Sequence, residues 1–107
     1  MNCQVEFTDT AKSDLREIAV RIAELSRDRN LAIRFVKELQ EKAKLLEQFP
    51  ECGSIPKDRV LKSSGNRFLV HKDYLLFYLY EKAENKVYIV AVFNGKRDYM
   101  RVMKKYL

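Results

Sequence analysis

The stretch RFLVHKDYLLFYLYE, residues 67–81, decides the fold class. It is rich in aromatic side chains, which favour strands, and the Lys72-Asp73 pair in its middle is typical of a tight turn or a bulge. The sequence therefore predicts one strand over Arg67–Lys72 and a second over Tyr74–Glu81. After a short polar turn, a third strand is predicted over Val87–Phe93.

The segments on either side of these strands are shorter. Arg59–Ser63 is predicted as a weak strand, because the apolar period changes to two from its first residue. Glu51–Asp58 before it is predicted as a loop, and Ser64-Gly65-Asn66 after it as a turn. Beyond the third strand, Asn94-Gly95 turns the chain again. Asp98–Tyr106 places apolar and aromatic residues at helical spacing, so we expect a short helix there.

The first half of the chain follows a helical period. Cys3–Phe7 alternates apolar and polar residues and predicts a short strand, but two amphipathic helices follow it. The candidate capping residues are Thr8 or Asp9 for the first helix and Asp28 or Asn30 for the second. Phe49-Pro50 ends the second helix, because the residue before proline disfavours the α region. Two such helices joined by a short polar link predict an αα-hairpin.

The predicted order is therefore β-α-α-β-β-β, followed by the short helix. Strands segregated from helices indicate an α+β fold, with an antiparallel sheet packed on the helical hairpin, and this length predicts a single domain over residues 1–107. In the middle strand we expect Leu75, Phe77 and Leu79 to face the helices, and Tyr74, Leu76, Tyr78 and Tyr80 to face the other way. The predicted core between hairpin and sheet is Leu15, Ile18, Phe35, Leu39, Phe77 and Ile89.

Charge is distributed unevenly along the chain. The formal net charge is +6. Residues 1–50 hold nine Lys and Arg and nine Asp and Glu, whereas residues 51–107 hold twelve against six. The whole excess lies in the second half, which favours an anionic partner such as RNA, DNA or an acidic protein segment. A basic surface that only keeps the protein soluble is the alternative.

The sequence also excludes several classes of protein. No wholly apolar run is longer than Tyr74–Tyr80, which is far short of the roughly 20 residues of a membrane span. The N-terminal residues lack the basic and apolar regions of a signal peptide, so we expect a cytoplasmic protein with Cys3 and Cys52 as free thiols. One histidine and two distant cysteines are too few ligands for a metal site, so we expect none. The sequence contains no nucleotide-binding motif, so we expect no cofactor.

The second half offers side chains for phosphate chemistry. RNA cleavage by 2′-hydroxyl attack needs a base, an acid and charge stabilisation at the phosphate. His71 is the only side chain with an unperturbed pKa near neutrality, although a surface or structural role is the plainer interpretation. Tyrosines such as Tyr99 could stack on bases. The candidate cations are Arg67, Lys72, Lys96, Arg97 and Arg101.

Four segments together give the chain a resemblance to a known family. They are residues 7–15 (FTDTAKSDL), 49–53 (FPECG), 67–78 (RFLVHKDYLLFY) and 92–98 (VFNGKRD). In this order and spacing, the chain resembles the RelE/ParE family of bacterial toxins. The resemblance implies the fold described above, a toxin of a type II toxin–antitoxin module, and a cognate antitoxin that wraps the toxin in a hetero-oligomer.

The resemblance also implies two alternative targets. RelE-like members cleave mRNA in the ribosome, whereas ParE-like members inhibit DNA gyrase and cleave nothing. Arg97 matches the family's basic residue after the last strand, but Leu75 stands where the nucleases often carry an arginine, and Met103 where an aromatic acid or base is expected. The departures favour the ParE-like branch; a member that only binds partners is a third, weaker interpretation.

The predicted site has two parts. Arg97 and Arg67 are the candidate catalytic residues if the chain is a metal-independent endoribonuclease. The residues predicted to bind the target or nucleic acid are Lys96, Arg101, Lys104, Lys105, Lys72, His71 and Tyr99.

Overall fold

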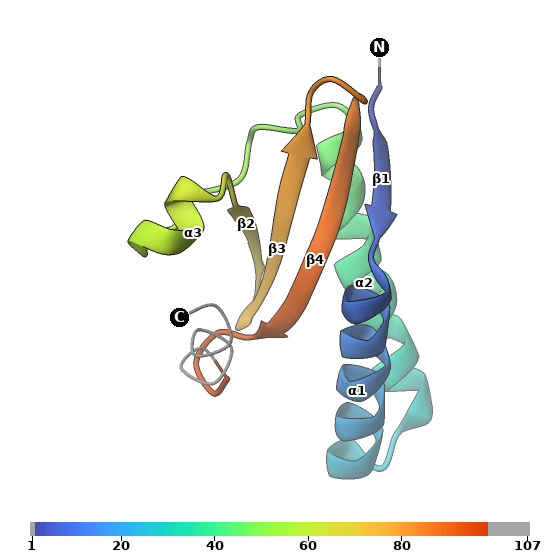
Figure 1. Ribbon diagram of the computed structural model, residues 1–107. Helices are drawn as coiled ribbons and strands as arrows, with labels where there is room; N and C mark the ends of the chain where they lie inside the picture. The colour runs from blue at the N-terminus through green and yellow to red at the C-terminus, as the bar shows by residue number, and fades with distance from the viewer. Residues whose placement is uncertain (1, 99–107) are drawn as a thin grey trace.

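The computed structural model describes residues 2–98, and its two long helices form the predicted hairpin (Figure 1). Helix α1 (Asp9–Ser26) begins where the Thr8 side chain accepts a hydrogen bond from the Ala11 amide. Helix α2 (Arg29–Lys44) begins in the same way, with Asp28 accepting from the Leu31 amide. In each case one of the two predicted capping residues satisfies a backbone amide that the helix leaves unpaired. A short 3₁₀ helix, η1 (Leu45–Glu47), continues α2.

The four described strands form one mixed sheet in the order β1-β4-β3-β2. They are β1 (Gln4–Phe7), β2 (Arg67–His71), β3 (Tyr74–Glu81) and β4 (Lys86–Asn94). Pairs β2–β3 and β3–β4 are antiparallel, but β1 pairs with β4 in parallel. The prediction of a purely antiparallel sheet was therefore wrong. A parallel pair requires a long crossover, and the hairpin between β1 and β2 is part of it.

Helix α1 covers the edge of β4 where β1 ends. The parallel pairing stops at Phe7 and Ile89, and both the amide and the hydroxyl of Thr8 then donate to the Ile89 carbonyl. Further along β4, the Val92 amide donates to the Asp14 carboxylate of α1 at 2.9 Å. Beyond β1, backbone groups on the edge of β4 thus bond to Thr8 and to α1 instead of to a neighbouring strand. These hydrogen bonds fix α1 against the strand that leads to the candidate site.

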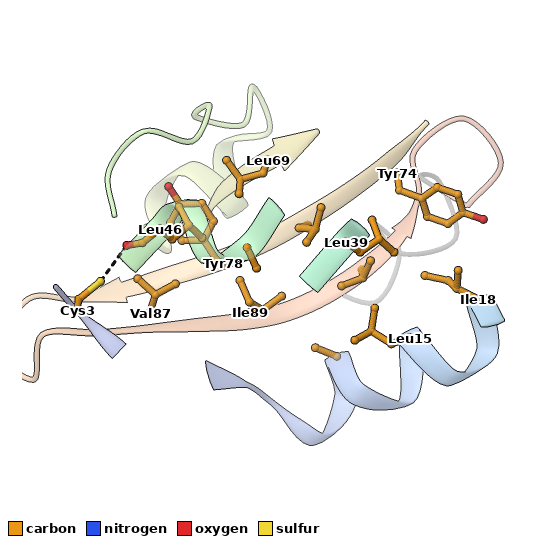
Figure 2. Packing of buried hydrophobic residues seen from close by; sticks show 14 residues of the cluster. Cys3, Leu15, Ile18, Leu39, Leu46, Leu69, Tyr74, Tyr78, Val87 and Ile89 are labelled. Atoms are coloured by element: carbon orange, nitrogen blue, oxygen red, sulfur yellow. Dashed lines mark hydrogen bonds between the residues drawn. The ribbon is translucent and has the colours of Figure 1, made fainter. Parts of the chain in front are cut away.

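The helix-covered face of the sheet carries the larger core (Figure 2). Of the predicted core residues, Leu15, Ile18, Leu39 and Ile89 are buried there, and Phe35 packs partly buried against them. The Cys3 thiol donates to the Leu46 carbonyl at 2.9 Å, and burial raises the pKa of this thiol. Both cysteines are free thiols, as predicted.

The predicted orientation of β3 was wrong. Tyr74, Leu76 and Tyr78 face the helices, whereas Phe77 is buried on the opposite face with Leu75 partly buried beside it. Both sets are apolar enough for a core, so alternation alone did not identify the helix-facing set. On β4 the register shifts opposite Phe77 and Tyr78, which changes the alternation there as well.

The opposite face of the sheet carries a second, smaller core. The rings of Phe68, Phe77 and Phe93, from β2, β3 and β4, stack in a row with centroids 5.4 Å apart. Ala91 and Leu61 are buried in the same cluster. Because neighbouring strands place such rings within contact distance, the stack ties three strands together.

The segment Arg59–Ser63, predicted as a weak strand, forms helix α3. The Asp58 carboxylate accepts hydrogen bonds from the amides of Val60 and Leu61 at 3.0 and 3.1 Å, which caps a helical turn. Leu61 is the buried residue of this turn and packs on the second core. The local cap therefore decides the structure over the period-two pattern.

The predicted helix Asp98–Tyr106 and the candidates Tyr99, Arg101, Lys104 and Lys105 lie outside the described residues, apart from Asp98. Within residues 2–98, no helix combines the length and apolar character needed to cross a membrane. The same part of the chain holds no group of three His, Cys, Asp or Glu side chains that could bind a metal ion.

Candidate functional site at the end of strand β4

Asn94 organises the turn that follows β4. Its side-chain oxygen accepts hydrogen bonds from the amides of Lys96 and Arg97, and its carbonyl accepts from the Asp98 amide at 2.8 Å. The Gly95 amide donates to the Asp73 carbonyl at 2.7 Å. The turn after β4 is thus fixed to the turn between β2 and β3, so residues far apart in sequence share one end of the sheet.

Gly95 allows this close approach. A Cβ atom at position 95 would lie 3.0 Å from Cγ of Leu75, tighter than ordinary van der Waals contact. A larger residue would therefore require the Leu75 side chain, or the turn that carries Lys96 and Arg97, to shift by a few tenths of an ångström.

The two basic side chains of this turn are both held by carboxylates. The Arg97 guanidinium lies 3.1 Å from Asp98, and the Lys96 ammonium lies 3.3 Å from Asp73. The hydrogen bond to Asp98, with a smaller contribution from Tyr74, raises the pKa of Arg97. The Arg97 side chain is 39% exposed and that of Lys96 is 81% exposed. Arg97 is thus the more firmly positioned of the two.

His71 and Lys72 lie near this end of the sheet but contact helix α2. The His71 Nε2 atom lies 2.8 Å from the Glu38 carboxylate, and the Lys72 ammonium lies 3.4 Å from the same oxygen. Hydrogen bonding to His71 is the main cause that lowers the pKa of Glu38. The Lys72 ammonium also sits 5.4 Å from the ring centroid of Phe35, within cation–π range. Both candidates therefore connect α2 to the sheet.

Arg67 lies at the other end of β2 and holds a loop. One guanidinium nitrogen donates to the carbonyls of Glu51 and Gly53 at 3.0 and 3.2 Å. The Gly53 amide in turn donates to the buried Tyr78 hydroxyl at 2.9 Å. A Cβ atom at position 53 would lie 2.6 Å from the Tyr78 ring, so glycine is required there.

The structure does not bring the two candidate catalytic arginines together. Arg67 pairs with Tyr78, whereas the turn that carries Arg97 begins at Asn94, which pairs with Tyr74. Tyr74 and Tyr78 are four positions apart on β3, a distance of about 13 Å along the strand. Lys96, Arg97, Lys72 and His71 share one end of the sheet; Arg67 does not.

An anion that binds the described cations of the predicted site meets carboxylates that are already in place. Each described cation of the predicted site already contacts a carboxylate of the same chain, so an incoming anion must displace that partner or bridge beside it. Residues 2–98 contain 18 Lys and Arg against 15 Asp and Glu. Half of the net charge of +6 therefore lies outside the described residues.

Sequence patterns alone did not identify the acidic partners of these cations. Glu38, Asp73 and Asp98 set the position of the candidate cations, and Tyr78 holds the loop at Gly53. Asp98 stands beside its partner Arg97 in the sequence, a signal that could have been used, whereas Asp73 stands beside Lys72 but pairs with Lys96. Glu38 is 33 residues from His71, and no local pattern connects the two.

A comparison with protein families gives one match across nearly the whole chain. The family model described as "ParE toxin of type II toxin-antitoxin system, parDE" matches residues 5–99. The matched range contains the helical hairpin, β1 from its second residue, the three other described strands and the turn with Arg97. No curated protein matches the chain.

Solved structures share the fold. A chain of the chromosomal ParDE toxin–antitoxin system from P. aeruginosa is similar with a TM-score of 0.71 and 19% identity, covering 86% of this chain and 95% of that one. The RelBE2 toxin–antitoxin complex from Mycobacterium tuberculosis gives a TM-score of 0.65 and 24% identity, covering 88% and 92%. A mutant of the E. coli toxin RelE in the free state gives 0.62 and 14%, covering both chains fully. At these identities the likeness is one of fold.

Proposed function

Because this chain belongs to the ParE toxin family of type II toxin–antitoxin systems, we propose that it inhibits growth by binding DNA gyrase without cleaving nucleic acid itself. The protein is a toxin of this class, and its target is the proposed part. It acts inside the cell, where gyrase works, until a cognate antitoxin binds it.

The separation of Arg67 from Arg97 is the observation that carries the proposal. Cleavage of RNA needs charge stabilisation and proton transfer at one phosphate. In the described residues, Arg67 is engaged with loop carbonyls about 13 Å along β3 from the Arg97 turn. His71, the one histidine of the chain, contacts Glu38 of α2. Such a site favours binding over catalysis.

Arg97 is the residue that we propose contacts the target. The turn from Asn94 to Asp98 fixes its backbone, and its guanidinium remains partly exposed beside Asp98. Lys96 and Lys72, both well exposed, add positive charge at the same end of the sheet. Tyr99, Arg101, Lys104 and Lys105 follow directly in sequence, so we propose that they extend the same binding surface.

The test compares the two possible targets with one protein preparation. Purified toxin is added to DNA gyrase in a supercoiling assay, and mRNA from induced cells is mapped by primer extension. We expect supercoiling to be inhibited and the mRNA to stay intact. If gyrase is unaffected while mRNA is cut at ribosome-dependent positions, the chain is an endoribonuclease and the gyrase proposal fails.

We also propose a toxin–antitoxin hetero-oligomer. Two of the similar structures are described as a ParDE toxin–antitoxin system and a RelBE2 toxin–antitoxin complex, which supports a protein partner for this chain as well. Co-expression with the adjacent gene and co-purification on a single affinity tag would test it. Recovery of the toxin alone, with the neighbouring protein expressed and soluble, would contradict the pairing.

A further inference from the structure

Helix α3 and the loop before it carry three cations that form no ion pair within the described residues. Lys57, Arg59 and Lys62 are exposed, and none of them forms an ion pair with another described residue. The acid among them, Asp58, uses a carboxylate oxygen to cap α3 through two backbone amides. This segment therefore differs from the end of β4, where each described cation has a carboxylate beside it.

Exposed apolar side chains lie among these cations. Ile55 is 53% exposed and Val60 is 43% exposed. Val60 is on α3 itself, between Arg59 and Leu61. Val70, on β2, is 48% exposed and shares the face of the sheet on which Leu61 packs, because it alternates with Phe68.

A single buried side chain holds α3 to the body. Leu61 is 2% exposed, whereas the four other residues of α3 are exposed. In Figure 1, α3 stands out beside the edge strand β2. A five-residue helix is too short to be stable on its own, so its outward face exists because the cap and Leu61 support it.

We propose that Ile55, Lys57, Arg59, Val60 and Lys62, here called the α3 patch, form a docking surface for an acidic and apolar segment of the antitoxin. The proposal rests on the proposed toxin–antitoxin pairing. The mixture of the two kinds of side chain selects the partner: cations that form no ion pair with another described residue attract carboxylates, while Ile55 and Val60 offer apolar area that a sugar–phosphate backbone does not use. A segment with alternating acidic and apolar residues fits both.

At the α3 patch, an acidic partner can also bind without competing with the carboxylates that pair with Lys96 and Arg97. An acidic segment that lands on Lys96 or Arg97 has to displace Asp73 or Asp98, or bridge beside them. At the α3 patch no carboxylate within the described residues has to leave. We therefore infer that the first encounter between toxin and antitoxin occurs at α3.

The test measures association of purified antitoxin with the full-length toxin by surface biosensor, at about 50 mM and about 500 mM salt. The variant Lys57→Glu/Lys62→Glu should associate on the order of tenfold more slowly at low salt, with the difference shrinking at high salt. The matched control is Lys12→Glu/Lys37→Glu, which makes the same charge change at exposed positions of α1 and α2. It should stay within about twofold of the wild type.

Each remaining outcome has a definite meaning. Equal slowing by both double variants would overturn the proposal, because net charge alone would then explain the effect. An unchanged rate in Lys57→Glu/Lys62→Glu, with a normal melting temperature, would overturn it as well. Val60→Ser should raise the dissociation rate instead of lowering the association rate, since it removes apolar contact. If the double variant loses affinity for a duplex DNA of about 20 base pairs but not for the antitoxin, the patch binds nucleic acid and the proposal fails.

The outcome is separable from that of the gyrase proposal. Antitoxin binding is measured without gyrase, so a toxin that fails to inhibit supercoiling can still be scored for docking at α3. Conversely, the Lys57→Glu/Lys62→Glu variant should inhibit supercoiling as the wild type does when antitoxin is absent.

Discussion

The two faces of the sheet are both apolar, but they are built and used differently. The face under α1 and α2 buries two tyrosines, Tyr74 and Tyr78, among aliphatic residues, and the Tyr78 hydroxyl accepts a hydrogen bond from the Gly53 amide. The opposite face buries stacked phenylalanine rings and is joined by one residue of α3. The hydroxyl of a buried tyrosine needs a hydrogen-bond partner, and on the helix-covered face Tyr78 finds it in the loop at Gly53. Among the described residues, the phenylalanine face buries no such hydroxyl and is held by ring packing.

The first prediction tests whether the phenylalanine face is a true core. Phe77 is 5% exposed and stacks between Phe68 and Phe93. Phe77→Ala should lower the free energy of unfolding by about 3–5 kcal/mol, measured by urea denaturation. A loss below about 1 kcal/mol would mean that this face contributes little and that stability comes from the helix-covered face alone.

The second prediction concerns the polar tip on the helix-covered face. Tyr78→Phe keeps the ring but leaves the Gly53 amide without its acceptor, which should cost about 1–3 kcal/mol of unfolding free energy. Tyr80→Phe is the control, because Tyr80 is only partly buried against the same core. If both variants lose the same amount, the hydroxyl of Tyr78 has no special role in holding the loop.

The third prediction concerns the link between α2 and the sheet. Glu38 contacts His71 and Lys72, and its pKa is lowered chiefly by the hydrogen bond to His71. Its stabilising contribution is therefore present above the unfolded value of about 4.3 and is lost as pH falls through the lower folded value. The difference in melting temperature between wild type and Glu38→Gln should shrink on acidification from about pH 6 to about pH 3.

Glu41→Gln serves as the control for this pH series. It removes an ion pair with Lys44 that lies within α2. A pH-dependent difference as large as that of Glu38→Gln would contradict a specific link between α2 and β2.

The smallest effect on stability, and the largest on function, is expected at Arg97. Its side chain is partly exposed and contacts its sequence neighbour Asp98, so Arg97→Ala should leave the melting temperature nearly unchanged while growth inhibition is lost. Arg67→Ala should lower the free energy of unfolding by about 1 kcal/mol, because its hydrogen bonds to the loop are lost. It should weaken growth inhibition without abolishing it. A stable and fully toxic Arg97→Ala variant would remove Arg97 from the target surface.

Much of this fold could be predicted from periodicity and capping. The helices begin at Thr8 and Asp28, among the predicted capping residues, and the strand of residues 74–81 has its predicted bounds. The orientation of that strand could not be predicted, because Leu75 and Phe77 are as apolar as Leu76 and Tyr78 and only tertiary packing distinguishes the sets. Helix α3 was missed because a single cap at Asp58 outweighs a weak pattern over five residues.

The candidate site was predictable in position but not in its contacts. The turn chemistry of Asn94-Gly95 correctly located the place where the basic pair leaves the sheet. The pairing of Lys96 with Asp73 and of His71 with Glu38 depends on distances between elements, which spacing along the chain does not contain. Sequence therefore indicated where positive charge gathers, but not that carboxylates already neutralise it.

The parallel pairing of β1 with β4 has a consequence for how the toxin is made. Gln4 pairs with Lys86 and Phe7 with Ile89, so β1 cannot join the sheet before β4, the last described strand in sequence, has formed. In the sheet, β4 lies between β1 and β3. Contacts this remote in sequence are slow to form because a long loop must close first. During synthesis at about 5–20 residues per second, β1 and the helical hairpin emerge seconds before the strand that completes the sheet. The sheet therefore cannot be completed until β4 is available, because β4 joins β1 to the other two strands.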